Sequence, residues 1–224
     1  MSSTIPFHPS LKPYTLPPAT FIQSRPHIGR ILCSSILFHP SSSSSPLLTL
    51  LLRRSPSDYF PLLWETPGGS LDSDSDTSII EAAVRELKEE TGLRAEKALA
   101  CIAVPELMKS QASPATTNEK EDAYNLEDGG QVLTFPEPGA GWSWAKMTFL
   151  MEVEGGDGDV EVVLQPEEHV DYRWATEEEI VEGRFKAKEG DEVTGDEEEI
   201  SFVSEAVRLA VLEAFRVKKE MMAT

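Results

Sequence analysis

A capped amphipathic helix over residues 78–91 is the segment of this chain whose local structure is most narrowly determined. Ser78, with Glu81 three residues later, has the pattern of a capping box, and Gly92 marks the helix end. Between these signals the apolar residues recur at helical spacing, at Ile80, Ala83, Val84 and Leu87. The helix therefore presents one apolar stripe, and its acidic residues are expected on the opposite side.

The acidic side of this helix predicts a metal site. Residues three and four apart share a helix face, so Glu86, Glu89 and Glu90 are expected to project together. Like charges at this spacing repel one another, at a cost of roughly a few tenths of a kcal/mol for each pair. Mg²⁺ binds one or two carboxylates while it shares substrate phosphates and keeps waters. The helix therefore predicts a Mg²⁺ site that serves a phosphate-containing substrate.

Apolar runs separated by turn residues predict several strands and two further helices. Strands are expected in a short segment that ends at Trp64 and over residues 28–39, 47–54, 98–104, 144–153 and 170–174. A helix capped by Thr176 and an amphipathic helix over 200–218 are also expected. The stretch 109–143 is rich in Ser, Pro, Gly, Asn and acidic residues, so it is interpreted as a long loop.

A single domain preceded by an arm is the expected organisation of the 224 residues. Prolines are dense in residues 1–27, which are expected to form an extended arm because proline disfavours regular helix. Residues 28–224 are expected to form one domain. Loop insertions are expected within it at about 40–46, 109–143 and 187–199.

The charge balance argues against two classes of partner. Lysine and arginine number 20 against 39 aspartates and glutamates, and the net charge of -19 repels phosphate backbones and anionic membranes. Polymeric nucleic acid and membranes are therefore not expected as partners. A small phosphorylated substrate is compatible with this charge, because a bound divalent cation locally inverts the sign of an acidic site.

The cysteines and the length of the apolar runs bear on the compartment. Cys33 and Cys101 each lie in an apolar run without CxxC spacing, so buried free thiols are expected. No run approaches the roughly 18 apolar residues of a membrane span. The N-terminus lacks a basic start followed by a long apolar stretch. An intracellular, cytoplasmic protein is therefore expected.

The segment that starts at Arg85 resembles the Nudix box, whose second half reads Arg-Glu-aliphatic-any-Glu-Glu-any-Gly-aliphatic. All seven fixed positions of that half are present, as Arg85, Glu86, Leu87, Glu89, Glu90, Gly92 and Leu93. Similar Nudix proteins also carry an acidic-His-aromatic segment before a late helix, which is matched here by Glu167, Glu168, His169 and Trp174. The resemblance covers about residues 28–183.

The first half of the box, Gly, five residues, Glu and seven residues before the Arg, is not matched. Counting back from Arg85 puts Thr77 at the Glu position and Leu71 at the Gly position. If Gly69 is instead the box glycine, the stretch to Arg85 is two residues too long. In that alignment Asp74 or Asp76 would stand in for the missing Glu, inside an enlarged turn.

The resemblance implies an α/β/α sandwich, in which a central mixed sheet lies between helices and the loop-helix-loop of the box holds Mg²⁺, with Mn²⁺ as an alternative ion. Glu86, Glu89 and Glu90 would be metal ligands or, for one of them, the base that activates water. Arg85 would orient the cluster through ion pairs. Gly69 would lend its backbone near the metal.

The activity that the resemblance implies is hydrolysis of a phosphoanhydride bond in a nucleoside diphosphate linked to another moiety. Glu168 is a candidate for a further ligand or base from a separate loop. Two alternatives stay open: a Nudix-like nucleotide-sensing or regulatory module without turnover, suggested by the altered first half of the box, and an acidic interaction protein whose box is coincidental. The partner would be a small nucleotide-type substrate, and a homodimer is left open.

Overall fold

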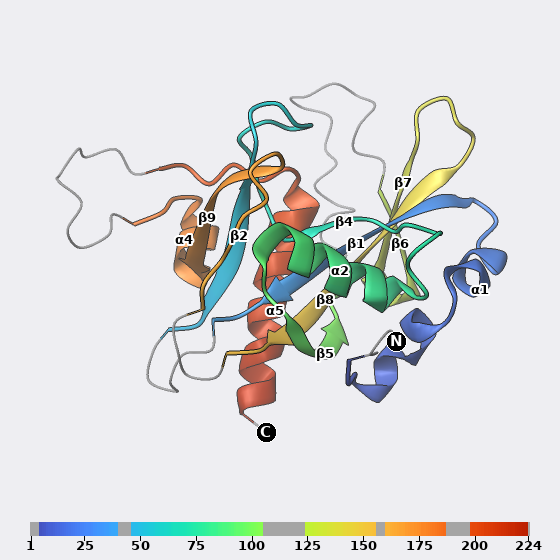
Figure 1. Cartoon of the computed structure of the whole chain (residues 1–224), viewed down its shortest axis with the longest axis horizontal. Coiled ribbons are helices and arrows are strands. Elements are labelled where there is room, and N and C mark those ends of the chain that lie inside the picture. The colour runs from blue at the N-terminus through green and yellow to red at the C-terminus, as the bar shows by residue number, and fades with distance from the viewer. Residues whose placement is uncertain (1–4, 40–45, 105–123, 156–159, 187–197, 224) are drawn as a thin grey trace.

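The computed structural model describes residues 5–39, 46–104, 124–155, 160–186 and 198–223. Two β-sheets and several helices build a mixed α/β fold, which Figure 1 shows. Within the described part of the chain, no helix combines the length and apolar character needed to cross a membrane.

The larger sheet has six strands and is mixed. Its strands are β1 (Ile28–Leu37), β4 (Gly68–Ser70), β5 (Ala95–Cys101), β6 (Asn125–Glu127), β7 (Val132–Pro136) and β8 (Ser143–Val153). The order is β4-β1-β8-β7-β6, and β5 also pairs with β8. β1 and β8 run parallel, whereas the other pairs are antiparallel. At one edge β4 places Gly68 opposite Ser34 and Gly69 opposite Cys33.

The smaller sheet has three antiparallel strands with β2 in the middle. They are β2 (Leu48–Arg54), β3 (Trp64–Glu65) and β9 (His169–Thr176). Leu52 pairs with Glu65 on one side of β2, and Arg54 pairs with His169 on the other. This register brings Glu65 and His169 to the same end of the sheet.

Helices cover the larger sheet on both sides, which confirms the predicted sandwich with a central mixed sheet. In Figure 1, α2 (Ile79–Thr91) lies in front of this sheet and α5 (Glu205–Met222) lies behind it. Alternate residues of β8 point to the two sides, because side chains alternate along a strand. Met147 and Phe149 lie in one core with α2, and Leu150 lies in a second core with α5. The remaining helices are η1 (Pro9–Thr15), α1 (Pro18–Gln23), η2 (Asp128–Gly130) and α4 (Glu177–Glu182).

The N-terminal segment differs from the predicted extended arm. Residues 9–23 form η1 and α1, with prolines in the first turn of each, where the missing N–H would have no helical partner. Leu11, Tyr14 and Phe21 are buried in the core around α2. The Tyr14 ring meets Phe149 of β8 edge to face, with 5.4 Å between ring centroids. Apolar side chains among the prolines therefore anchor a segment that proline density alone describes as extended.

Two further boundaries also differ from the sequence predictions. The expected loop 109–143 contains the short strands β6 and β7, which are stabilised by pairing with each other and with β8. Its residues 109–123 lie outside the described residues, as do residues 40–45 and 187–197 of the other two expected insertions. The last helix begins at Glu205 rather than at 200. Backbone hydrogen bonds from Trp64 to Ser201 and from Val203 to Trp64 hold the preceding residues extended.

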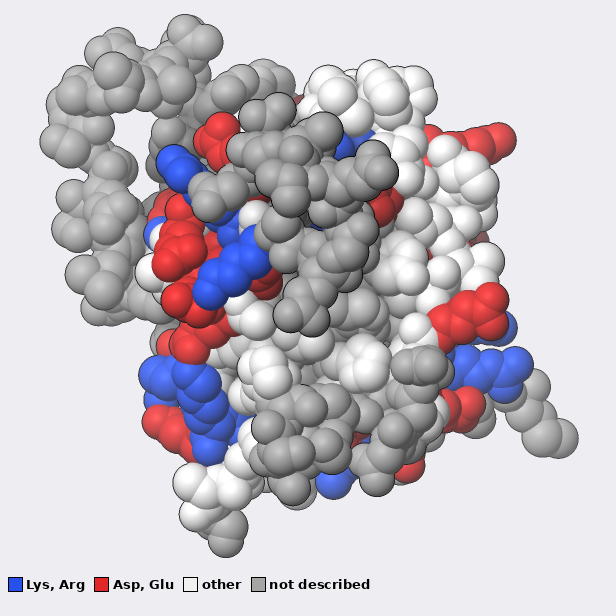
Figure 2. Space-filling model, turned by 90° about the vertical axis from the view of Figure 1, so that its left-hand side faces the viewer, with Lys and Arg blue, Asp and Glu red and all other residues white. Residues whose placement is uncertain are grey.

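Charged side chains of both signs share the face shown in Figure 2, where blue and red groups lie beside one another. Ion pairs between described residues of the two charge types include Lys219 with Glu177 and Arg53 with Glu198. The described lysines and arginines on this face therefore do not form a separate basic patch.

Tyr14→Ala tests whether the N-terminal segment contributes to the core. Tyr14 is 3% exposed, so loss of its ring should lower the free energy of unfolding by about 3–5 kcal/mol in urea denaturation. Leu16→Ala is the matched control, because Leu16 is 41% exposed and should cost less than about 1 kcal/mol. Equal, small losses in both variants would mean that the segment does not pack on the domain.

Candidate active site

Helix α2 carries most of the candidate site, and both of its ends are fixed by local interactions. At the N-terminus the Ser78 hydroxyl accepts a hydrogen bond from the Glu81 backbone N–H at 3.2 Å. The reciprocal half of the predicted capping box is absent, because the Glu81 carboxylate accepts from Thr77 instead. At the C-terminus Gly92 adopts φ 71°, the left-handed conformation that glycine tolerates best.

The Glu90 carboxylate is buried, at 5% exposure of the residue, and accepts a 2.7 Å hydrogen bond from the Gly68 N–H. The prediction that all three carboxylates lie opposite the apolar stripe is therefore wrong for Glu90. Position 90 is three residues after Leu87, so it borders the buried stripe and points toward β4. A carboxylate withdrawn from water in this way requires polar or cationic compensation.

Glu86 lies one turn earlier, and its carboxylate packs against Gly69 of β4. A Cβ atom at position 69 would lie 2.6 Å from the Glu86 carboxyl carbon, so the glycine leaves the room that this carboxylate occupies. The Glu86 side chain is 13% exposed. Gly69 therefore lies directly beside the Glu86 carboxylate.

Arg85 ties the turn before α2 to the carboxylates on the helix. Its guanidinium donates to both Asp76 oxygens, at 3.0 and 2.9 Å, and to the Ser70 carbonyl at 3.1 Å. It also forms ion pairs with Glu86 at 3.0 Å and Glu89 at 2.8 Å. The Glu89 side chain is 59% exposed, so Arg85 holds Glu89 at the outer rim of the site.

The enlarged turn between β4 and α2 closes on Asp76. The Asp72 N–H donates to the Asp76 carboxylate at 2.8 Å, and the Asp76 N–H donates to the Asp72 carbonyl at the same distance. Asp76 is buried, whereas Asp74 is exposed. Of the two expected substitutes for the missing glutamate, Asp76 contacts Arg85 and Asp74 faces solvent.

Arg54, Glu65 and His169 of the smaller sheet form a connected set of polar contacts. Glu65 was not identified as a site residue from the sequence. Glu65 accepts from Arg54 and lies 3.1 Å from the His169 Nε2 atom. His169 is 2% exposed, and its Nδ1 atom has no hydrogen-bond partner among the described residues. The available sequence signal was an acidic residue directly before Thr66 and the Pro-Gly-Gly turn, within an otherwise apolar segment.

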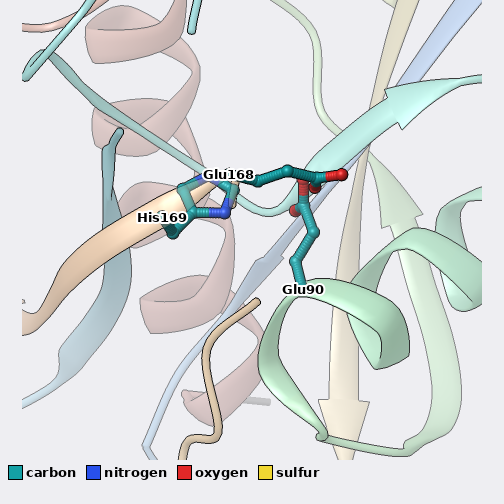
Figure 3. Close-up of side chains that lie close together, drawn as sticks. All are labelled: Glu90, Glu168 and His169. Carbon is teal, nitrogen blue, oxygen red and sulfur yellow. The ribbon is translucent and has the colours of Figure 1, made fainter. Parts of the chain in front are cut away.

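Glu90, Glu168 and His169 converge, as Figure 3 shows. Each offers one potential metal-binding atom, and these atoms all lie within 4.8 Å of one another. Glu168 is exposed at the start of β9, while its two partners are buried. The structure therefore brings together two of the predicted site residues, Glu90 and Glu168, from separate segments. Glu89 is not part of this group.

Glu86, Glu90 and Glu168 are called the acidic cluster below. Burial and mutual repulsion disfavour the state in which all three carboxylates are charged and no cation is bound. Burial raises the pKa of Glu90 well above its usual value, and the Glu65, Glu86 and Glu168 charges raise it further, against the Gly68 hydrogen bond. Burial also raises the pKa of Glu86, which Arg85 partly offsets. Carboxylate oxygens are the ligands that a hard divalent cation prefers. Glu86, Glu90 and Glu168 would hold it.

A family model described as NUDIX domain matches residues 41–197 of the chain. The matched region contains α2, the turn before it and the start of β9, and therefore every residue of the acidic cluster. None of the curated proteins compared with the chain matches it.

Three solved structures are similar to this chain. The Nudix hydrolase RenU from M. smegmatis is 16% identical, with a TM-score of 0.50, and the match covers 88% of this chain and 87% of that chain. The MutT protein from Methanosarcina mazei Go1 is 19% identical, with a TM-score of 0.49 and coverage of 85% and 95%. The NUDIX domain of Shewanella oneidensis NrtR, complexed with ADP ribose, is 14% identical, with a TM-score of 0.49 and coverage of 84% and 87%.

Glu90→Gln tests the charge repulsion in the cluster. The amide oxygen of glutamine can still accept the Gly68 hydrogen bond, but the substitution removes the negative charge. At pH 8 without divalent ions the melting temperature should therefore rise, by about 2–4 °C for each kcal/mol of repulsion that is removed. A raised pKa in the folded protein means that stability is lost as pH rises above the ordinary glutamate range. The gain should therefore shrink at pH 5.

Glu89→Gln is the matched control for this measurement, because Glu89 lies at the exposed rim. It should leave the melting temperature within about 1 °C of the wild type at both pH values. A melting temperature that falls in Glu90→Gln would contradict the repulsion between Glu90 and its acidic neighbours.

Proposed function

Because the chain belongs to the Nudix family of hydrolases, we propose that it is a Mg²⁺-dependent enzyme that cleaves a phosphoanhydride bond in a nucleoside diphosphate linked to another moiety. The observation that carries this proposal is the convergence of Glu90 and Glu168 beside Glu86. An acidic interaction protein with a coincidental box is excluded by the family membership.

In this proposal Glu86, Glu90 and Glu168 bind the metal through oxygen, and Glu89 supports them from the rim. Mg²⁺ suits such a site because it prefers oxygen ligands and keeps several waters. Mn²⁺ accepts the same ligands. Arg85 acts as a positioning residue, since its contacts with Asp76 fix it while it holds Glu86 and Glu89.

The proposed reaction is attack of water on one phosphorus atom of the anhydride. When bound, the divalent cation neutralises phosphate oxygens and lowers the pKa of water. Glu89, which is exposed and is not one of the proposed metal ligands, accepts the proton of the attacking water. One P–O bond forms, the bridging P–O bond breaks, and its electron pair leaves with the second phosphate.

A substrate panel with two metals tests this proposal. Purified protein should release nucleotide or phosphate from ADP-ribose, a sugar nucleotide or a dinucleoside polyphosphate with Mg²⁺ or Mn²⁺, and chelation should abolish the release. Glu86→Gln and Glu90→Gln should each lower kcat/KM by about 100-fold or more, because each removes a charged ligand. Glu81→Gln is the matched control on α2, as its carboxylate contacts Thr77 rather than the cluster.

Two results would count against parts of this proposal. Wild-type turnover in both Glu86→Gln and Glu90→Gln would remove the metal role of the cluster. Binding of a nucleotide without turnover of any panel member would favour the alternative, a Nudix-like sensing or regulatory module.

A further inference from the structure

Lys146 of β8 lies on the sheet face opposite α2, between Trp144 and Thr148 on the same side of the strand. Ala145 and Met147 point into the core with α2, so Lys146 points toward α5. Figure 1 shows β8 running between these two helices. Lys146 lines a small pocket together with Thr66, Ile102, Val104, Gln131, Leu133, Thr148, Ala206, Val207 and Ala210.

The Lys146 ammonium has no hydrogen bond or close ion pair with the described residues. By contrast, the surface lysines Lys186 and Lys219 contact carboxylates. Burial lowers the pKa of Lys146 from its usual value and the charge of Arg54 lowers it further, while Glu65, Cys33 and Glu90 partly oppose this effect. A partly buried cation without a direct partner is costly, so the position calls for a ligand.

The neighbours of Lys146 indicate the charge of that ligand. Glu65 and Glu90 attract the ammonium, but Glu90 belongs to the cluster that is proposed to bind a divalent cation. Once a cation takes up that negative charge, two positive groups lie near one another. An anion is the group that stabilises both.

We infer that Lys146 binds an anionic oxygen of the substrate, from a phosphoryl group beside the metal-binding carboxylates. This inference rests on the proposed function and adds a specificity-determining residue to it. Thr66 lines the same pocket and directly follows Glu65, whose carboxylate lies 3.1 Å from the Nε2 atom of His169, a neighbour of Glu90 and Glu168.

The pocket that Lys146 lines is large enough for a phosphoryl oxygen but too small for a nucleobase. Its volume is about 10 Å³, room for about one water molecule. Thr66, Gln131 and Thr148 supply polar groups to its wall. Such a space admits a phosphoryl oxygen or its water at the mouth and excludes a nucleobase ring. Lys146 therefore recognises phosphate, and the base is recognised elsewhere.

Calorimetric titration with inorganic pyrophosphate, in the presence of Mg²⁺, tests the inference without turnover of a nucleotide. Lys146→Met should weaken pyrophosphate binding by roughly 10- to 100-fold, the range for loss of a charge-assisted hydrogen bond. Lys146→Arg should retain most of the affinity, since it keeps the charge. Lys97→Met is the matched control: Lys97 lies exposed on neighbouring β5, and its loss changes the net charge equally.

Two accompanying measurements separate this inference from the proposed function and from misfolding. The melting temperature of ligand-free Lys146→Met should not fall, because methionine fills a similar volume without a buried charge. Mn²⁺ binding followed by electron paramagnetic resonance should be unchanged in Lys146→Met. If this variant fails to fold, Lys146→Gln replaces it in the same titration.

Equal pyrophosphate affinity in the wild type and Lys146→Met would overturn the inference, even where nucleotides are still hydrolysed. Absence of pyrophosphate binding by the wild type would overturn it as well. If only the proposed function is wrong, no panel substrate is turned over. Pyrophosphate still binds in that case, and its binding still depends on Lys146.

Discussion

The burial of the Glu90 carboxylate against the Gly68 N–H is the interaction on which the rest of the site depends. It joins the last turn of α2 to β4, and so fixes the distance between the helix and the edge of the larger sheet. The same carboxylate borders Glu168 and His169 of the second sheet. One hydrogen bond cannot replace the hydration of a carboxylate. The ionised form of Glu90 therefore needs a positive charge nearby. A bound divalent cation would supply that charge.

The fold supplies the remaining groups from segments that are distant in the chain. β2 pairs with both β3 and β9, and this pairing sets Glu65 against His169. The glycine at position 69 leaves space for Glu86, where any Cβ atom would collide with its carboxylate. Arg85, anchored by the buried Asp76, then faces the helical carboxylates. Repulsion between the clustered carboxylates lowers the stability of the fold. Apolar burial in the two cores on either side of the larger sheet offsets this loss.

The sequence predicted the elements that have strong local patterns. It did not predict the features that depend on contacts between distant segments. The helix over 79–91 was predicted from its cap, its spacing and Gly92, and Cys33 and Cys101 are free and buried as expected. The strands β6 and β7 were missed because their stability comes from pairing. The burial of Glu90 and the contact between Glu65 and His169 depend on how α2, β3 and β9 meet, which no spacing in the chain encodes. The ion pairs of Arg85 were expected from the resemblance, whereas its anchoring by Asp76 required the structure.

Glu86, Glu90 and Glu168 are proposed to share one divalent cation. Anomalous diffraction from crystals of the protein grown with Mn²⁺ tests it most directly, because the ion is located without reference to activity. We expect a Mn²⁺ peak within about 2.0–2.4 Å of carboxylate oxygens from at least two of these residues. An ordered cluster with no peak at saturating Mn²⁺, or a peak bound only by carboxylates elsewhere, would contradict it.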